Sequence, residues 1–154
     1  MWLSGTDIDT SRATIVRLDR ASGAVQTAID FDRVPCESSA YWEKALWTAT
    51  CSPAGVAKID ATTNKTVAFS KLDVPEELDQ EASIGAGEGG VWLVVNGPDC
   101  VQCLVAHLDR DLELQVKIPV TAGAAAVEVG LGRSGPSIKE TGPSPATPRP
   151  PRRP

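Results

Sequence analysis

A regular spacing of tryptophans is the feature that most constrains this chain. Trp2, Trp47 and Trp92 follow one another at intervals of 45 residues, and each lies in a short apolar run. Glycines precede the last of these runs, which extends from Val91 to Val95. Fixed periods of roughly 20–50 residues are typical of repeated supersecondary units. The sequence therefore predicts a repeat protein in which each unit of about 45 residues has the same arrangement of secondary structure.

Each repeat carries the pattern of several short strands. Downstream of each Trp lies an alternating segment that ends in an apolar residue followed by Asp19, Asp60 or Asp109. Alternation predicts a half-buried strand, and Asp followed by Gly23 or Asn64 predicts a tight turn in the first two repeats. A further strand is expected after each turn, over residues 24–31, 66–72 and 114–120. Only Pro75–Gln80 carries a helix signal, for a single turn.

Four strands in about 45 residues are typical of a β-propeller blade. We therefore expect an all-β fold, a partial β-propeller with about three four-stranded antiparallel blades. The blades are expected over residues 1–32, 33–74 and 81–120, and the first strand of a further blade over 122–132. Three blades are too few to close a ring. The end blades should then expose apolar faces, which repeat proteins normally cap.

The character of the sequence changes at residue 133. Residues 133–154 are rich in Pro and Arg without apolar periodicity, which predicts a disordered tail. The position one period after Trp92 is Ser137, so the aromatic pattern stops there. This abrupt loss suggests a truncated or frameshifted gene product, a hypothesis that sequencing of the source locus would test.

The distribution of charge separates the tail from the rest of the chain. The tail has five basic residues and one Glu, a net charge of +4, and the whole chain carries −5, which leaves −9 for residues 1–132. Such an acidic body disfavours nucleic acid, whose binding needs clustered Lys and Arg. No apolar run approaches the ~18 residues of a membrane-spanning helix. No signal peptide precedes Trp2 either.

The four cysteines form two local pairs, Cys36 with Cys51 and Cys100 with Cys103. Two disulfides in an exported protein fit this arrangement better than cytosolic thiols. If the strands around Trp47 are antiparallel neighbours, Cys36 and Cys51 come opposite one another. For the C-x-x-C pair a disulfide is favoured over half a zinc site or a redox pair. Export would imply that a natural amino-terminal part is absent from this chain.

Other candidate features have structural interpretations. Residues 85–90 satisfy G-x-G-x-x-G, but a strand and not a helix follows, so turns and close backbone approach are favoured over nucleotide binding. His107 lies in a strand without a catalytic partner and is expected to be structural. Trp42 and Glu43 are expected in the turn before the second Trp strand, lining a ligand surface or packing between blades.

The repeats resemble those of the YVTN/streptogramin (virginiamycin B) lyase-like β-propeller superfamily. The resemblance rests on residues 87–93 with 104–109 and on residues 45–47 with 56–67, and it covers about residues 1–132. It implies a propeller fold and, for many members, export from a bacterial cell. A lyase of this family would use a His and glutamates with magnesium. That pattern cannot be placed on this sequence, so no catalytic residue is carried over.

The leading hypothesis is therefore a module of a periplasmic or secreted binding or scaffold protein, without catalysis, cofactor or metal of its own. Its expected partners are remaining propeller blades or another protein chain, and a small-molecule ligand is a further candidate. Neither nucleic acid nor a membrane span is expected. The alternatives are part of a streptogramin-lyase-like or quinoprotein-like enzyme whose active residues lie in missing blades, and a fragment without independent function.

Overall fold

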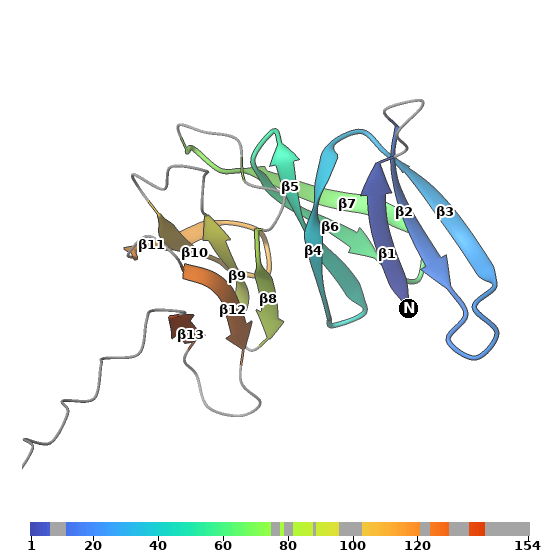
Figure 1. Cartoon of the computed structure of the whole chain (residues 1–154). Coiled ribbons are helices and arrows are strands. Elements are labelled where there is room, and N and C mark those ends of the chain that lie inside the picture. The colour runs from blue at the N-terminus through green and yellow to red at the C-terminus, as the bar shows by residue number, and fades with distance from the viewer. Residues whose placement is uncertain are drawn as a thin grey trace, which may run out of the picture.

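The computed structural model describes residues 1–6, 12–74, 78, 82–87, 89–95, 103–120, 124–129 and 136–140. Every regular element in these ranges is a β-strand, and all strand pairs are antiparallel (Figure 1). The all-β prediction is thus confirmed for the described residues, which include no helix capable of crossing a membrane. Within Pro75–Gln80 only Leu78 is described, so the predicted helical turn lies outside these residues.

The strands form four sheets that follow one another along the chain, and in each sheet consecutive strands are neighbours. Sheet 1 contains β1 (Trp2–Thr6), β2 (Ala13–Leu18) and β3 (Val25–Phe31). Sheet 2 contains β4 (Val34–Trp42), β5 (Ala45–Ser52), β6 (Gly55–Asp60) and β7 (Lys65–Lys71). Sheet 3 contains β8 (Ile84–Gly87), β9 (Gly90–Val95), β10 (Leu104–Leu108) and β11 (Leu114–Pro119). Sheet 4 contains β12 (Ala124–Val129) and β13 (Pro136–Glu140).

The first three sheets share a register shift between their last two strands. The shift falls between Arg17 and Leu18 in sheet 1, between Lys58 and Ile59 in sheet 2, and between His107 and Leu108 in sheet 3. In each case one residue of the outer strand is skipped in the pairing, as in a β-bulge. Because the shift lies just before the turn Asp each time, the three sheets repeat one design in detail.

Successive sheets pack face to face, with an apolar layer between each pair. Ile15 and Phe31 of sheet 1 meet Leu46 and Ile59 of sheet 2 in one buried cluster. The layer between sheets 2 and 3 is larger and includes Trp47, Val56, Leu93 and Leu108, and the layer between sheets 3 and 4 includes Val94, Val105 and Val127. Each fully buried aliphatic side chain stabilises such a layer by about 1.5–3 kcal/mol. Figure 1 shows this succession across the molecule, from sheet 1 at the right to sheets 3 and 4 at the left.

The first strands of sheets 2, 3 and 4 form a seam between the layers. β8 contacts both β4 and β12. Ser38 Oγ in β4 accepts a hydrogen bond from the backbone N–H of Ile84 in β8, at 3.1 Å. Ser83 Oγ, next to β8, accepts one from the N–H of Val127 in β12, also at 3.1 Å. The two serines are 45 residues apart, so the seam repeats with the same period as the tryptophans.

The prediction of a disordered tail from residue 133 needs a correction at one place. Residues Pro136–Glu140 form β13, which pairs antiparallel with β12 in sheet 4. A first-position Pro is compatible with a strand because its missing N–H is least needed there. The open edge of β12 gives this short segment a partner, which the sequence pattern alone did not suggest. The rest of the predicted tail lies outside the described residues.

Candidate functional site

The three repeat tryptophans lie at equivalent positions, each directly opposite a basic or imidazole side chain on the next strand. Trp2 pairs with Arg17, Trp47 with Lys58 and Trp92 with His107. The Arg17 guanidinium lies 5.4 Å from the centre of the Trp2 ring, and the Lys58 ammonium lies 4.6 Å from that of Trp47. Such cation–π contacts are favourable by about 0.5–2 kcal/mol, depending on exposure.

The third pair differs in chemistry while keeping the geometry. The Trp92 and His107 rings stack at 4.2 Å between centroids with an interplanar angle of 16°. His107 Nε2 lies 2.9 Å from the carbonyl oxygen of Gly89. A carbonyl only accepts, so Nε2 carries the proton in this contact. The half-buried His107 is thus held by Trp92 and the backbone, in agreement with a structural role.

The cations of the first two pairs also link neighbouring sheets. Arg17 Nη1 of sheet 1 donates to the carbonyl oxygen of Ala61 in sheet 2 at 2.7 Å. Lys58 Nζ of sheet 2 donates to the carbonyl oxygen of Arg110 in sheet 3 at 2.9 Å. Ala61 and Arg110 each directly follow the turn Asp of their own sheet. One side chain therefore stacks on the Trp of its own sheet and binds the turn of the next.

The turn aspartates organise the loops that receive these cations. Asp19 Oδ1 accepts hydrogen bonds from the backbone N–H groups of Ala21 and Ser22, and Asp60 Oδ1 accepts those of Thr62 and Thr63. Asp109 Oδ1 likewise accepts from Asp111 and Glu113 N–H, at 2.9 Å each. The turns at Asp19 and Asp60 are Asx-type turns, as the sequence predicts. The turn at Asp109 is of the same kind although it lacks the Gly or Asn, and Leu112 has φ of 66° there.

Hydrogen bonding changes the acidity of two of these groups. The bond from the backbone N–H of Ser22, together with its hydroxyl, lowers the pKa of Asp19 below its ordinary 3.8. The backbone N–H of Thr63, followed by that of Thr62, lowers the pKa of Asp60 in the same way. Donors that bind the ionised carboxylate favour that form. Both aspartates therefore hold their turns in the charged state.

Sheets 2 and 3 are further joined by an aromatic and ionic contact at the β4–β5 turn. Trp42 lies 6.1 Å from Trp47, and the Arg110 guanidinium of sheet 3 lies 5.5 Å from the Trp42 ring. Arg110 Nη2 also approaches Glu43 Oε1 at 3.5 Å. Trp42 ends β4, whereas Glu43 and Lys44 form the turn with φ of 48° and 60°. Of the two predicted roles for Trp42, packing between sheets is the one observed.

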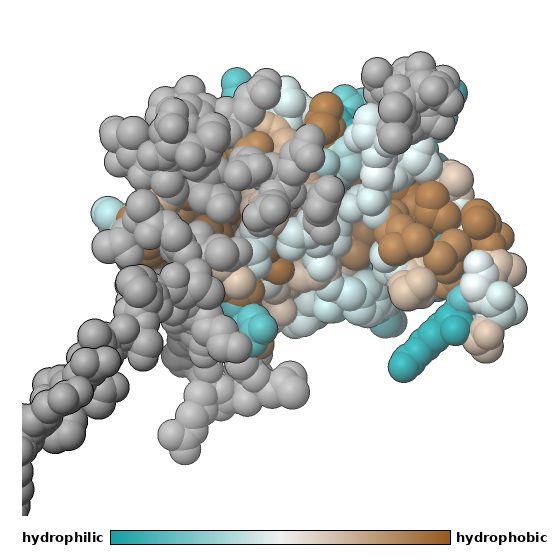
Figure 2. All heavy atoms as spheres, viewed as in Figure 1, coloured by the Kyte–Doolittle hydropathy of each residue, from teal (hydrophilic) through white to brown (hydrophobic). Residues whose placement is uncertain are grey.

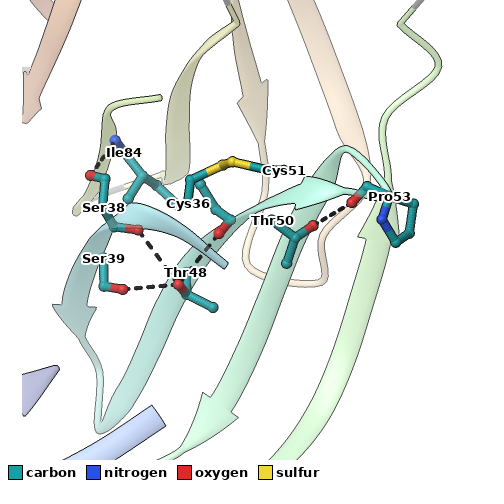
Figure 3. The surroundings of a disulfide bond; sticks show 9 residues. Cys36, Ser38, Ser39, Thr48, Thr50, Cys51, Pro53 and Ile84 are labelled. Atoms are coloured by element: carbon teal, nitrogen blue, oxygen red, sulfur yellow. Dashed lines mark hydrogen bonds between the residues drawn. A yellow bond between two sulfur atoms is a disulfide. The ribbon is translucent and has the colours of Figure 1, made fainter. Parts of the chain in front are cut away.

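The predicted disulfide between Cys36 and Cys51 is present and buried in the layer between sheets 2 and 3 (Figure 3). The two Cα atoms are 5.2 Å apart, within the usual range of about 4.4–6.8 Å. Figure 3 also shows Thr48 and Thr50, which point to the opposite side of β5 from Cys51. Cys103 is disulfide-bonded as well, and its predicted partner Cys100 lies outside the described residues.

The glycine-rich segment forms a β-hairpin between β8 and β9, which removes the structural context that nucleotide binding requires. Gly90 has φ of 133°, and a Cβ there would overlap the carbonyl oxygen of Leu108. A Cβ on Gly87 would lie 2.5 Å from Cγ1 of Val129 in β12. These glycines therefore permit a tight turn and a close approach of sheet 4, as the structural interpretation predicts.

An open groove of about 440 Å³ lies where sheet 1 meets sheet 2. Its charged lining consists of two ion pairs, Arg12 with Asp30 at 2.7 Å and Arg33 with Asp32. The Arg33 side chain is only 21% exposed and stacks on the Phe69 ring at 4.1 Å. The charges cancel, and Arg33 is held from two sides. The groove thus offers paired hydrogen-bonding groups and a planar cation to a small polar ligand.

The candidate groups singled out from the sequence are engaged in contacts that stabilise the sheets and turns. Among the described residues, no group of three or more His, Cys, Asp or Glu side chains is placed to hold a metal ion. Cys36 and Cys51 lie in the apolar layer between sheets 2 and 3, His107 stacks on Trp92, and the turn aspartates bind backbone N–H groups. The most developed arrangement is therefore the repeated Trp–cation pair with its link to the next sheet.

Several residues of this arrangement were missed from the sequence. Arg17, Lys58 and His107 each stand two positions before a turn Asp, in Arg-Leu-Asp, Lys-Ile-Asp and His-Leu-Asp. The common basic or imidazole position in that motif was the available signal. Ser38 and Ser83 could have been found from their 45-residue spacing. Arg110 has a weaker signal, because an Arg also follows the turn Asp in the first repeat (Arg20) but an Ala follows it in the second (Ala61).

Comparison with known proteins adds no assignment. No protein-family model matches the chain, and no curated protein matches it.

Proposed function

We propose that this chain is a β-propeller repeat module from an exported binding or scaffold protein of the YVTN/virginiamycin B lyase-like type. On this proposal sheets 1, 2 and 3 are successive blades, and sheet 4 begins the next one. The main support is the link in which Arg17 and Lys58 stack on the Trp of their own sheet and donate to the next sheet's turn. The link is present at the step from sheet 1 to sheet 2 and again at the step from sheet 2 to sheet 3, as expected for repeats that contact only their neighbours.

Export is supported by cysteine chemistry. A disulfide buried between two sheets forms readily in an oxidising compartment, whereas cytosolic thiols stay reduced. The Cys36–Cys51 bond closes a separation of 15 residues within one sheet. We therefore place the protein in the periplasm or outside the cell.

A binding role is supported by the kind of surface that the chain offers. The groove between sheets 1 and 2 presents Arg12 and Arg33, each already paired with an Asp. A ligand that carries both a carboxylate and a hydrogen-bond donor would meet complementary groups there. Sheets 1 and 2 and the connection between them form the groove walls.

The proposal is tested first by its compartment. The chain is produced with a cleavable export signal in the bacterial periplasm and without it in the cytoplasm, and peptides are mapped without reduction. We expect the Cys36–Cys51 bond only in the exported protein, which should therefore have the higher melting temperature. Cytoplasmic protein with reduced Cys36 and Cys51 and the same melting temperature would contradict export.

The second test separates binding from catalysis. Purified protein is incubated with virginiamycin B with and without magnesium, and linearised product is measured by mass spectrometry. We expect no product in either condition. Magnesium-dependent linearisation would overturn the binding-only proposal and establish the lyase alternative, whereas the compartment test would be unaffected.

A further inference from the structure

Two of the four sheets have fewer than four described strands, and they differ in which strands are present. Sheet 1 has three strands in the order β1-β2-β3, and no described strand pairs with the other edge of β1. Sheet 4 supplies a first strand, β12, which takes the place that β4 and β8 have in sheets 2 and 3. The Ser83–Val127 bond of β12 repeats the Ser38–Ile84 bond of β8. Among the described residues, sheet 1 thus has no strand of the kind that β12 provides in sheet 4.

The pairing register indicates which kind of strand would pair with β12. In sheet 2 Trp47 stands opposite Ala40, and in sheet 3 Trp92 stands opposite Gly85. The equivalent pair in sheet 4 is Ser137 opposite Glu128. The strand β13 thus occupies the position of a Trp strand without carrying a Trp. The β12–β13 pairing also contains a register shift between Ala124 and Val127.

The exposed apolar side chains lie on the two surfaces that these sheets leave uncovered. On sheet 1, Leu3 is 52% exposed and Met1 is 62% exposed, and both point away from sheet 2. Leu3, with Val16 and Thr14, lines a shallow groove of about 310 Å³ on this face. Figure 2 shows apolar surface over the sheet 1 end of the molecule, at the right.

The second uncovered surface is the outer half of sheet 3. Val116 and Ile118 of β11 are 40% and 36% exposed. They pair with His107 and Val105 and so share the face that sheet 4 covers. Sheet 4 has no described outer strands, so it covers only the part of this face near Val94 and Val105. A complete sheet in that place would cover Val116 and Ile118.

We propose that the occupant of both surfaces is a second copy of this chain. Strand β1 of one copy pairs with β12 of the other, in place of β13, and completes a four-stranded sheet β12-β1-β2-β3. The register of sheets 2 and 3 then sets Trp2 opposite Glu128, Leu3 opposite Val127 and Ser4 opposite Ala126. Sheet 1 of one copy packs on sheet 3 of the other. This packing buries the side chains of Leu3 and Ile118, which are exposed to water in the single chain.

The same arrangement completes the series of links between sheets. Arg17 binds the residue after Asp60, and Lys58 binds the residue after Asp109. The third residue of this kind, His107, would face the exposed turn residue Arg20, which follows Asp19, in the second copy. His107 would thus stand at the position that Arg17 and Lys58 have at the other junctions, with its Nε2 still bonded to the carbonyl oxygen of Gly89.

The inference rests on the proposed function, because it treats the sheets as propeller blades. Each copy contributes sheets 2 and 3 and one composite sheet, so two copies contain six. Propellers close with about four to eight blades. A head-to-tail interface that closes gives a finite ring and not a filament. We therefore expect a closed dimer.

The first experiment measures the mass of the full chain by light scattering after size exclusion, from low to high micromolar concentration. The expected mass is 32.4 kDa, twice the 16.2 kDa of one chain. Leu3→Arg places a charge in the proposed interface and should give monomer. Val67→Arg is the matched control, because Val67 is 55% exposed on β7, away from both surfaces, and should leave the dimer intact.

A further variant tests the exchange of strands. Ile138→Pro removes a backbone N–H from β13 and should free β12 for the second copy, which lowers the Kd of the dimer. Wild-type protein that remains monomeric at every concentration, or a Leu3→Arg variant that dimerises like the wild type, would overturn the proposal. A Kd raised by Ile138→Pro would show that β13 belongs to the interface and would also overturn it.

Cross-linking tests the register directly. Ser4→Cys and Ala126→Cys proteins are mixed and oxidised, and covalent dimer is expected from the mixture and not from either variant alone. Thr62→Cys mixed with Ala126→Cys is the control and should give none. Equal yields in both mixtures would overturn the pairing. A monomer with an intact Cys36–Cys51 bond and no lyase activity would refute the dimer and leave the proposed function standing.

Discussion

Sheets 1 and 2 repeat one design, but within the part of the chain that the structure describes only sheet 2 has a neighbour on both faces. Position by position, Leu46 is 3% exposed whereas its equivalent Met1 is 62% exposed. Thr48 is fully buried, whereas its equivalent Leu3 is 52% exposed. The covered strand carries the hydroxyl and the uncovered strand carries the leucine. Burial in this molecule is thus decided by the neighbouring sheet and not by the polarity of the residue.

The hydrogen bonds of Thr48 and Thr50 show how sheet 2 tolerates buried hydroxyl groups. Thr48 Oγ1 accepts a hydrogen bond from Ser39 Oγ at 2.9 Å, and Thr50 Oγ1 donates to the carbonyl oxygen of Pro53 at 2.6 Å. A buried hydroxyl costs little when it is bonded and about 1–3 kcal/mol when it is not. Sheet 2 therefore depends on contacts within itself as well as on its neighbours, and each dependence is open to test.

The largest expected difference concerns the tryptophans. Trp47→Ala removes a fully buried ring and should lower the free energy of unfolding by about 3–5 kcal/mol. Trp2→Ala removes a half-buried ring and should cost about 1–2 kcal/mol. Urea unfolding of dilute protein followed by far-ultraviolet circular dichroism measures both. Equal losses would mean that Trp47 gains nothing from its complete burial in the layer between sheets 2 and 3.

Sequence reasoning succeeded where a local signal repeats. The Trp period, the turn aspartates and the cysteine pair predicted the strands, the turns and the Cys36–Cys51 bond. It failed where a structure depends on contact with a segment that is distant in the sequence. β13 forms because β12 has an open edge. The residues around Ile138 show no alternating pattern that would predict a strand. Lys58 and Trp47 are both evident in the sequence, but their stacking follows from the pairing register of β5 and β6, which the sequence pattern did not specify.

The disulfide of sheet 2 gives the next largest effect, and sheet 1 has no equivalent. Replacing both Cys36 and Cys51 by Ala opens the loop between positions 15 residues apart. The entropic model predicts a loss of about 3 kcal/mol. Urea unfolding of the double variant is compared with that of the wild type, both with and without reductant. A variant as stable as the oxidised wild type would show that inter-sheet packing alone fixes sheet 2.

A smaller loss is expected from Thr50→Val. The substitution keeps the shape of the side chain but leaves the Pro53 carbonyl without its donor. We expect a loss of about 1–2 kcal/mol. Thr66→Val on the exposed part of β7 serves as the control and should change stability by less than about 0.5 kcal/mol. If Thr50→Val stabilises the protein, hydroxyl bonding is not what sheet 2 needs there.

The smallest effect concerns the Asx turns, which sheets 1 and 2 have in common although their faces are covered to different extents by neighbouring sheets. The pKa of Asp19 and that of Asp60 are both lowered from 3.8 by backbone hydrogen bonds, chiefly from Ser22 and Thr63. A carboxyl whose pKa is lower in the folded state binds fewer protons there than in the unfolded chain. Its contribution to stability is therefore complete above the unfolded pKa and is lost as the pH falls through the folded value. Asp19→Asn and Asp60→Asn should each reduce the loss of stability on acidification below about pH 4, and to a similar extent. Urea midpoints of the wild type and both variants between neutral and acidic pH measure this. A response confined to Asp60→Asn would show that the turn of sheet 1 is not held as that of sheet 2 is, and the likeness of the two sheets would then end at their strands.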